Sequence, residues 1–177
     1  MFLRSVPTPA LVLGTTGLVP FYLAALAIFL SQDARMAGFL LSVQILYGAI
    51  VASFLGAVQW GMAMVNMGSE RKRHADPARW NDGGDGQGRY EPAVRQMLYS
   101  VAPALIGWSI VLSFQIIPEK TMAIIAITAM SCLYLACYIA DRRAARFGLM
   151  PEWYIEMRLP LTVAVIFAYF CTAFALL

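Results

Sequence analysis

Among the side chains in the apolar stretches of this chain, amides and hydroxyls of the second and third stretches can form hydrogen bonds. Gln44 and Gln59 share one long apolar stretch with Ser53, and Ser100 lies in the next stretch. Amides and hydroxyls can bond to an uncharged solute, a quinone or a lipid headgroup, or simply to neighbouring helices. The two amides are 15 residues apart, about 22 Å along a helix. Neither is therefore expected at the centre of a bilayer, which weakens a midplane transport site.

Residues that usually carry catalysis or bind metals are scarce. His74 is the only histidine, so the chain cannot hold a haem from both sides or form a multi-histidine metal site. A serine hydrolase would need His74 to reach a serine such as Ser100, and no motif supports that pairing. We predict no catalytic residue, no cofactor, no metal and no enzyme activity. The three cysteines lie in apolar stretches and are interpreted as packing residues: Cys132, Cys137 and Cys171.

The composition indicates a membrane protein. Hydrophobic residues make up 60% of the chain and charged residues 13%, whereas soluble domains are about a quarter charged. A helix of about 20 apolar residues crosses the hydrocarbon core. We predict an all-α, polytopic membrane bundle of five transmembrane helices, with residues 1–177 as a single membrane domain. The predicted spans are residues 9–30, 36–65, 94–117, 121–140 and 159–177.

The basic residues predict an orientation. Eleven of the 13 lysines and arginines precede the first span, lie between the second and third spans or between the fourth and fifth, or, in the case of Arg95, lie at the start of the third span. Only Arg35 and Lys120 lie on the opposite connections. The positive-inside rule then places the N-terminus in the cytoplasm or an organelle matrix and the C-terminus across the membrane. Residues 68–92 are predicted to be a flexible polar loop on the inner side. The basic charge indicates contact with anionic headgroups rather than nucleic acid.

Residues 141–158 are predicted to be an interfacial segment on the inner side. Glu152 and Glu156 are expected to pair with arginines of this segment. No carboxylate, histidine or lysine falls within the predicted spans, so a proton-coupled transporter is not expected. Tryptophan and tyrosine favour the headgroup boundary, and arginine can keep its charge in water there. The interfacial candidates are Trp153, Tyr154 and Arg158.

The second span carries a face of small and amide residues. At about 100° per residue, residues four apart gather on one side of a helix, and small ones let helix backbones approach closely. We predict that this face packs against other helices. The packing and polar-face candidates, including neighbours in the second and third spans, are Gln44, Gly48, Ala52, Ser53, Gly56, Gln59, Trp60, Ser100 and Pro103.

Prolines and glycines predict kinks in three of the spans. Gly17 and Pro20 lie in the first span, Pro103 and Gly107 in the third, and Pro160 at the start of the fifth. A proline removes a backbone donor, so a neighbouring group must bond to the carbonyl that it frees. We interpret these residues as structural kinks rather than ligand sites.

Several strings of residues together resemble the DUF3429 family of small multi-pass membrane proteins, which includes transmembrane protein 69. They are residues 53–61 (SFLGAVQWG), 99–103 (YSVAP) with Trp108, and 151–154 (PEWY) with Arg158. Their order matches over nearly the whole chain. The resemblance implies a bacterial or mitochondrial inner-membrane protein without an established activity, and it transfers no catalytic residue. The family often has histidine where this sequence has Gln59, so a histidine-dependent role does not carry over.

Two function classes follow from these features. The first is a nonenzymatic accessory or assembly protein that associates with a larger membrane complex or with copies of itself. The second is a small channel or facilitator for an uncharged solute or a lipid, with Gln44, Ser53, Gln59 and Ser100 as hydrogen-bonding groups. A packed bundle with an exposed ridge of small residues would favour association. A wet cavity joining the four polar residues would favour the facilitator.

Overall fold

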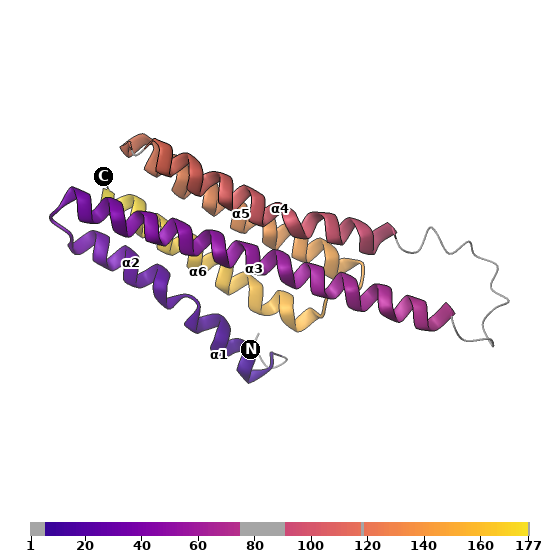
Figure 1. Cartoon of the computed structure of the whole chain (residues 1–177). Coiled ribbons are helices and arrows are strands. Elements are labelled where there is room, and N and C mark those ends of the chain that lie inside the picture. The colour runs from indigo at the N-terminus through magenta and orange to yellow at the C-terminus, as the bar shows by residue number, and fades with distance from the viewer. Residues whose placement is uncertain (1–5, 75–90, 118, 177) are drawn as a thin grey trace.

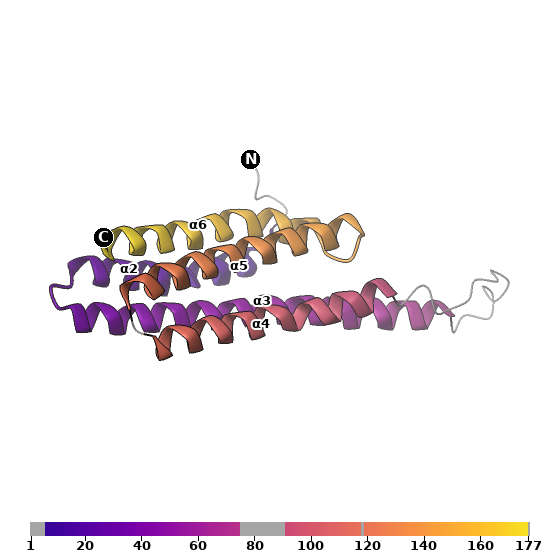
Figure 2. The same ribbon diagram turned by 90° about the horizontal axis from the view of Figure 1, so that it is seen from above.

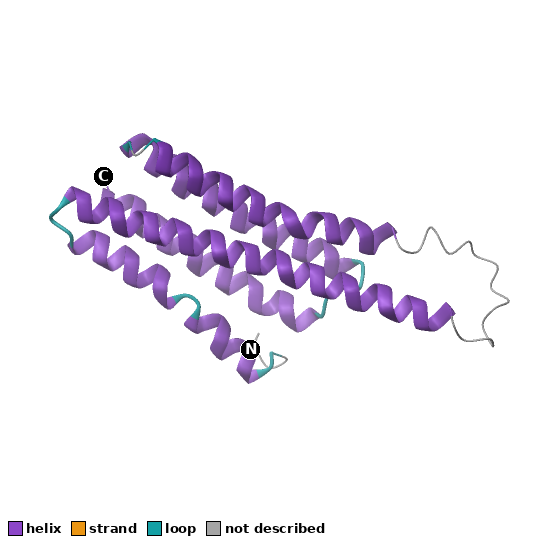
Figure 3. Cartoon of the chain, in the orientation of Figure 1, coloured by secondary structure: helices purple, strands orange, loops and turns teal. Residues whose placement is uncertain are grey.

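The computed structural model describes residues 6–74, 91–117 and 119–176, which form helices and no strand (Figure 3). Within these residues, five helical segments are long and apolar enough to cross a membrane. This confirms the predicted all-helical fold and its five candidate spans. The first span is built from two helices and each of the others from one. The helices are α1 (Thr8–Thr16), α2 (Val19–Leu30), α3 (Ala34–His74), α4 (Glu91–Ile116), α5 (Lys120–Arg146) and α6 (Glu152–Leu176).

The five spans run up and down in turn, so the start of α1 and the end of α6 lie at opposite ends of the bundle (Figure 1). α3 is the longest helix and packs against α2, α4 and α5. Figure 2 shows α3 and α4 side by side, with α6 on the opposite side of the bundle. α4 also packs against α5, so a seam between these two helices runs along one edge of the bundle.

The first span breaks where glycine and proline predict a kink. α1 ends at Thr16, and α2 begins at Val19 with Pro20 in its first turn. The Phe21 N–H donates to the Leu18 carbonyl, which leaves the Gly17 carbonyl outside the helical pattern. The Tyr47 hydroxyl of α3 donates to that carbonyl at 3.0 Å. The predicted break in the first span is therefore confirmed, and a neighbouring helix satisfies a carbonyl left free at the break.

Several helices extend past the ends of the apolar stretches. α3 continues to His74, so residues 68–74 of the predicted polar loop are helical, whereas residues 75–90 lie outside the described residues. Arginine, lysine and glutamate are good helix formers. A change from apolar to charged residues therefore marks the edge of the hydrocarbon core and not the end of the helix.

The same reasoning corrects the segment predicted at residues 141–158. α5 continues to Arg146 and α6 begins at Glu152, so most of this segment belongs to two spans joined by a short turn. Gly148 in the turn has a φ of 69°, a conformation that glycine adopts at little cost. Because α6 begins seven residues before the predicted start, Pro160 lies inside the helix rather than near its start.

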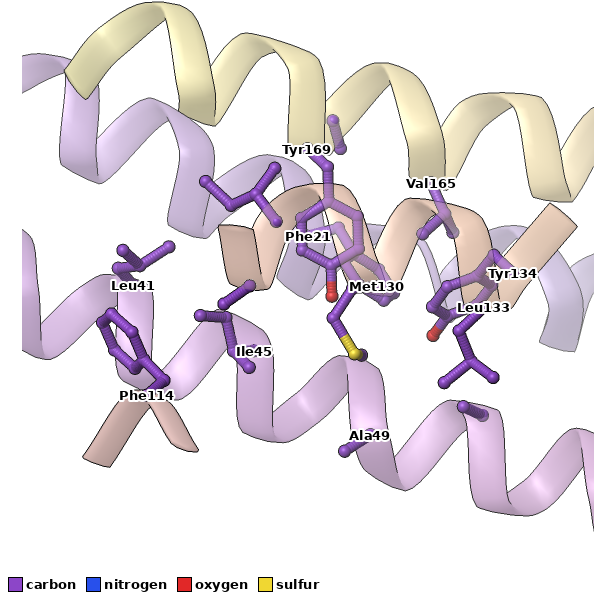
Figure 4. Close-up of a cluster of buried hydrophobic side chains, with 14 of the residues drawn as sticks. Phe21, Leu41, Ile45, Ala49, Phe114, Met130, Leu133, Tyr134, Val165 and Tyr169 are labelled. Atoms are coloured by element: carbon purple, nitrogen blue, oxygen red, sulfur yellow. The ribbon is translucent and has the colours of Figure 1, made fainter. Parts of the chain in front are cut away.

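Large side chains of five helices, α2 to α6, meet in the core (Figure 4). The Phe21 ring meets the Tyr169 ring edge to face, with centroids 5.6 Å apart. Gly48 of α3 makes room for Tyr169, since a Cβ atom there would lie 2.0 Å from the tyrosine oxygen. The Tyr134 hydroxyl donates to the Gly48 carbonyl at 2.9 Å. Lipid is as apolar as this core, so close packing and such hydrogen bonds hold the helices together.

Candidate functional site

A buried ion pair joins α5 to α6 inside the bundle. The Nε atom of Arg158 lies 2.8 Å from Oδ2 of Asp141. The two residues are only 4% and 2% exposed, and both lie within segments able to cross a membrane. Asp141 lies one residue past the predicted end of its span, so the predicted spans did not reveal this buried carboxylate. Arg158 is one of several arginines predicted to pair with Glu152 or Glu156, and its partner is instead Asp141. An ionisable residue within a membrane helix is by default a candidate functional residue.

Two amides extend the ion pair to α3 and α4. The Nε2 group of Gln59 donates to Oδ1 of Asp141. Gln96 Nε2 donates to Gln59 Oε1 at 2.7 Å. Both glutamines are buried, at 8% and 5% exposure. Four helices thus each contribute one side chain to a continuous hydrogen-bonded chain, which we name the polar cluster: Gln59, Gln96, Asp141 and Arg158.

Helical spacing explains why Asp141 of the polar cluster faces the bundle interior. On α5 the buried residues recur at intervals of three and four, as Met130, Tyr134, Cys137 and then Asp141. Residues at these intervals share one face of a helix. Asp141 thus continues the core-facing stripe of its helix. It lies five residues before the end of α5, about 8 Å along the axis.

A cavity of about 710 Å³ adjoins the polar cluster between α3, α4 and α5. Gln59, Gln96 and Asp141 contribute to its wall, and most of the remaining wall is apolar. Arg95 of α4 and Arg143 of α5 also line it, and both are exposed. The cavity therefore combines a buried polar region, an apolar wall and a cationic rim. Pockets for small ligands commonly have this size and this mixture of groups.

Some polar atoms around the cluster are buried without a hydrogen-bond partner among the described residues. They include Oε1 of Gln96 and Nη2 of Arg158. Buried polar groups are nearly always bonded, so each exception requires an explanation. Of these residues, Gln96 lines the cavity. Its side chain therefore borders the space that a ligand would occupy.

A family model described as "Protein of unknown function (DUF3429)" matches residues 6–174, which is nearly the whole chain. The chain belongs to the DUF3429 family. The family resemblance predicted from the sequence strings is confirmed, and the chain is a multi-pass membrane protein.

The DUF3429 chain is similar to transmembrane protein 69 of Xenopus tropicalis, with 28% identity over 166 residues. The match covers 94% of this chain and 54% of the relative, so the chain spans about half the length of that protein. No solved structure matches the chain. The family description assigns no activity, so the function must be argued from the cavity and the residues around it.

The polar and packing residues predicted from the DUF3429 sequence fall into two groups. Gly56, Gln59 and Pro103 line the cavity. Ser100 adjoins it, since its carbonyl lies against Gly56. The residues away from the cavity are Gln44, Gly48 and Ala52 in the core, Ser53 bonded to its own helix, and Trp60, which is 42% exposed.

The two amides of α3 have separate environments in the DUF3429 structure. Gln44 donates to the Phe21 carbonyl at 3.0 Å and accepts from the Thr172 hydroxyl at 3.0 Å. It is 1% exposed and does not line the cavity that contains Gln59. Gln44 therefore serves the packing of α2, α3 and α6, whereas Gln59 belongs to the polar cluster.

The interfacial candidates occupy more buried positions than predicted. Tyr154 and Arg158 are 7% and 4% exposed, because α6 already turns both side chains toward the bundle interior. Trp153 is half-buried and its ring meets that of Tyr154 edge to face, with centroids 6.1 Å apart. Of the three, only Trp153 retains the partial exposure expected of an interfacial anchor.

Asp141 and Gln96 are not among the predicted site residues, although helical spacing offers a signal for both. Asp141 continues the three-and-four spacing of buried residues past the last apolar residue of its span. Gln96 lies four residues before Ser100 and seven before Pro103, so the three share a helix face. Following each face beyond the apolar stretch would have placed both residues inside the bundle.

Proposed function

We propose that this protein binds a membrane amphiphile in the cavity between α3, α4 and α5, and that it acts as a facilitator for a lipid-like molecule rather than as an enzyme. The observation that carries the proposal is the joining of a buried polar cluster to an apolar wall in one cavity of about 710 Å³. A polar headgroup would occupy the region of Gln59, Gln96 and Asp141. The attached chain would lie along the apolar wall.

Access from the bilayer supports a lipid over a water-soluble compound. Tyr99 of α4 and Ile139 of α5 line the cavity and are 63% and 43% exposed. The cavity therefore reaches the outer surface of the bundle, which faces lipid. An amphiphile can enter sideways through such an opening without leaving the membrane.

The position of the polar groups argues against a pore for an uncharged solute. A pore would need polar groups along its whole length. Gln44 is enclosed by Phe21 and Thr172, and the Ser53 hydroxyl donates to the Ala49 carbonyl within α3. The hydrogen-bonding groups around the cavity instead gather toward one end of the bundle, as a headgroup site requires.

Association with a larger membrane complex stays a prediction, but the feature of α3 that suggested it does not support it. The small-residue face of α3 was expected to contact a partner helix. Its residues instead face other helices of the same chain: Gly48 faces Tyr169, and Gly56 faces Ser100. The face is therefore occupied within the bundle and is not an exposed ridge.

We also propose the predicted orientation, with the N-terminus inside, in a bacterial or mitochondrial inner membrane. Arg95, Arg143 and Arg146 lie near the ends of α4 and α5 that share one end of the bundle. Lys120 lies at the start of α5, at the other end. This distribution supports placing the cavity near the inner headgroups.

The proposal is tested by filling the cavity. Ala136 lines it, whereas the neighbouring Leu135 is 48% exposed and lies outside it. We expect Ala136→Phe to lose most of the lipids and quinones that remain bound after purification in mild detergent, measured by mass spectrometry of the extract per mole of protein. Leu135→Phe should retain them. Equal retention by the two variants would refute binding in this cavity.

A further inference from the structure

We infer that the amphiphile is an anionic phospholipid whose headgroup carries a free hydroxyl, with its phosphate held by Arg95 and Arg143 and its hydroxyl bonded to Gln96. This inference rests on the proposed function and adds the chemical class of the ligand. Three features of the cavity carry it: the charge of its rim, one unbonded acceptor, and its depth in the membrane.

The rim carries positive charge that no described side chain balances. Asp141 and Arg158 neutralise each other in their ion pair. Arg95 and Arg143 face the same cavity from different helices, and among the described residues neither forms a salt bridge. Guanidinium groups bind phosphate oxygens through paired, charge-assisted hydrogen bonds. An anionic headgroup therefore suits this rim better than a neutral quinone ring.

Gln96 specifies a hydrogen-bond donor on the ligand. Its Nε2 group already donates to Gln59 at 2.7 Å, whereas its Oε1 atom has no partner among the described residues. The side chain is 95% buried, so the unbonded oxygen lacks the compensation of bulk water. A hydroxyl group would satisfy this acceptor. A quinone carbonyl or a choline group has no hydrogen to donate to it.

The depth of the cavity matches the position of a phospholipid headgroup. Arg95 lies four residues after the start of α4, and Arg143 lies three residues before the end of α5. These separations correspond to about 5–6 Å along each helix. A second hollow of about 360 Å³ lies further along the α4–α5 seam, between residues such as Ile106, Ile110 and Ile125. An acyl chain leaving the headgroup site toward the membrane centre would follow this apolar seam.

The test compares single lipids added to the delipidated protein in one detergent, with binding measured by native mass spectrometry. The probes are phosphatidylglycerol, phosphatidic acid, phosphatidylethanolamine, phosphatidylcholine and ubiquinone. We expect phosphatidylglycerol to bind most tightly, because it alone of these combines a net negative charge with a headgroup hydroxyl beyond the phosphate. Tighter binding of ubiquinone, or equal binding of phosphatidylethanolamine, would overturn the assigned class.

Variants separate the two parts of the headgroup site. Arg95→Gln and Arg143→Gln should each weaken phosphatidylglycerol binding about fivefold, the effect of one arginine near a phosphate. Arg142→Gln removes the same charge from an exposed residue outside the cavity and should change the affinity far less. Gln96→Leu should weaken phosphatidylglycerol binding but leave phosphatidic acid binding unchanged. Equal losses for both lipids would overturn the hydroxyl contact.

Failure of the ligand class can be told apart from failure of the proposed function. If Ala136→Phe removes lipid binding but the double variant Arg95→Gln/Arg143→Gln still binds phosphatidylglycerol like the unaltered protein, the anionic class is overturned and the cavity remains a binding site. If Ala136→Phe binds every probe like the unaltered protein, the proposed function itself fails. The arginine variants change exposed side chains, so loss of folding is not expected to obscure the result.

Discussion

Asp141 and Arg158 are 17 residues apart in sequence and meet across the α5–α6 hairpin, where both are buried. The Arg158 Nε group and the Gln59 amide donate to the two different oxygens of the carboxylate. Inside a bundle, two charges that neutralise each other can persist, whereas one alone is costly. The ion pair therefore fixes the end of the hairpin and also holds Asp141 at the wall of the cavity.

Removing one partner of the ion pair should be strongly destabilising. In Arg158→Met the Asp141 carboxylate remains buried without its cation. We expect the free energy of unfolding in detergent to fall by about 3–5 kcal/mol. Arg146→Met, which removes an exposed arginine of the same hairpin, is the matched control and should change it by less than about 0.5 kcal/mol.

A second substitution distinguishes a lost charge partner from lost packing. Asp141→Leu/Arg158→Met removes both charges and keeps two apolar side chains of similar length. It should recover at least about half of the stability that Arg158→Met loses, since no unpaired charge remains. A double variant as unstable as the single one would mean that the arginine contributes mainly through its shape.

Much of the fold was predictable because the bilayer constrains it strongly. A hydrocarbon core requires long apolar helices with bonded backbones, so the five spans follow from apolar stretches alone. The kink at Gly17 and Pro20 follows from the missing proline donor. The ends of α3 and α5 were not predictable in this way. Their charged last turns continue to form helix outside the apolar region.

The site was less predictable, because it depends on which helices are neighbours. The spacing of α3 correctly predicted that Gln44 and Gln59 lie on one packed face. It did not predict that the two amides have different environments. That difference arises from Thr172 beside Gln44 and Asp141 beside Gln59, contacts 128 and 82 residues apart in sequence. The prediction assigned Asp141 to the inner segment 141–158, and so it missed the place of this residue on the buried face of α5.

The close contact of α3 with α4 at Gly56 gives a prediction about packing. A Cβ atom at Gly56 would lie 2.0 Å from the Ser100 carbonyl oxygen, so the two helices would have to separate. We expect Gly56→Ala to lower the free energy of unfolding by about 1–3 kcal/mol. Gly61, on the same helix, has no atom within 4 Å of its Cβ position. Gly61→Ala should raise stability by about 0.5–1 kcal/mol. Similar effects of both variants would contradict the contact.

Loss of the hydrogen bond at the kink of the first span should lower the free energy of unfolding by less than the loss of the buried ion pair. The Tyr47 hydroxyl is the group that satisfies the freed Gly17 carbonyl. Tyr47→Phe should lower the free energy of unfolding by roughly 0.6–1.7 kcal/mol, the range measured for hydrogen bonds between membrane helices. Tyr138→Phe is the control, because the Tyr138 hydroxyl bonds to none of the described residues. Unchanged stability of Tyr47→Phe alongside this control would show that the kink does not need the bond.

The proposed orientation predicts which end of α5 reacts with a reagent added outside. Lys120 and Arg146 are both exposed and lie at opposite ends of this helix, 26 residues apart. That separation is about 39 Å, more than the thickness of the hydrocarbon core of about 30 Å. In a background where the three native cysteines are alanine, Lys120→Cys should react with a membrane-impermeant maleimide in intact cells or mitoplasts. Arg146→Cys should react only after permeabilisation, because the arginine-rich ends are held inside. The opposite pattern would reverse the orientation and place the cavity at the outer headgroups.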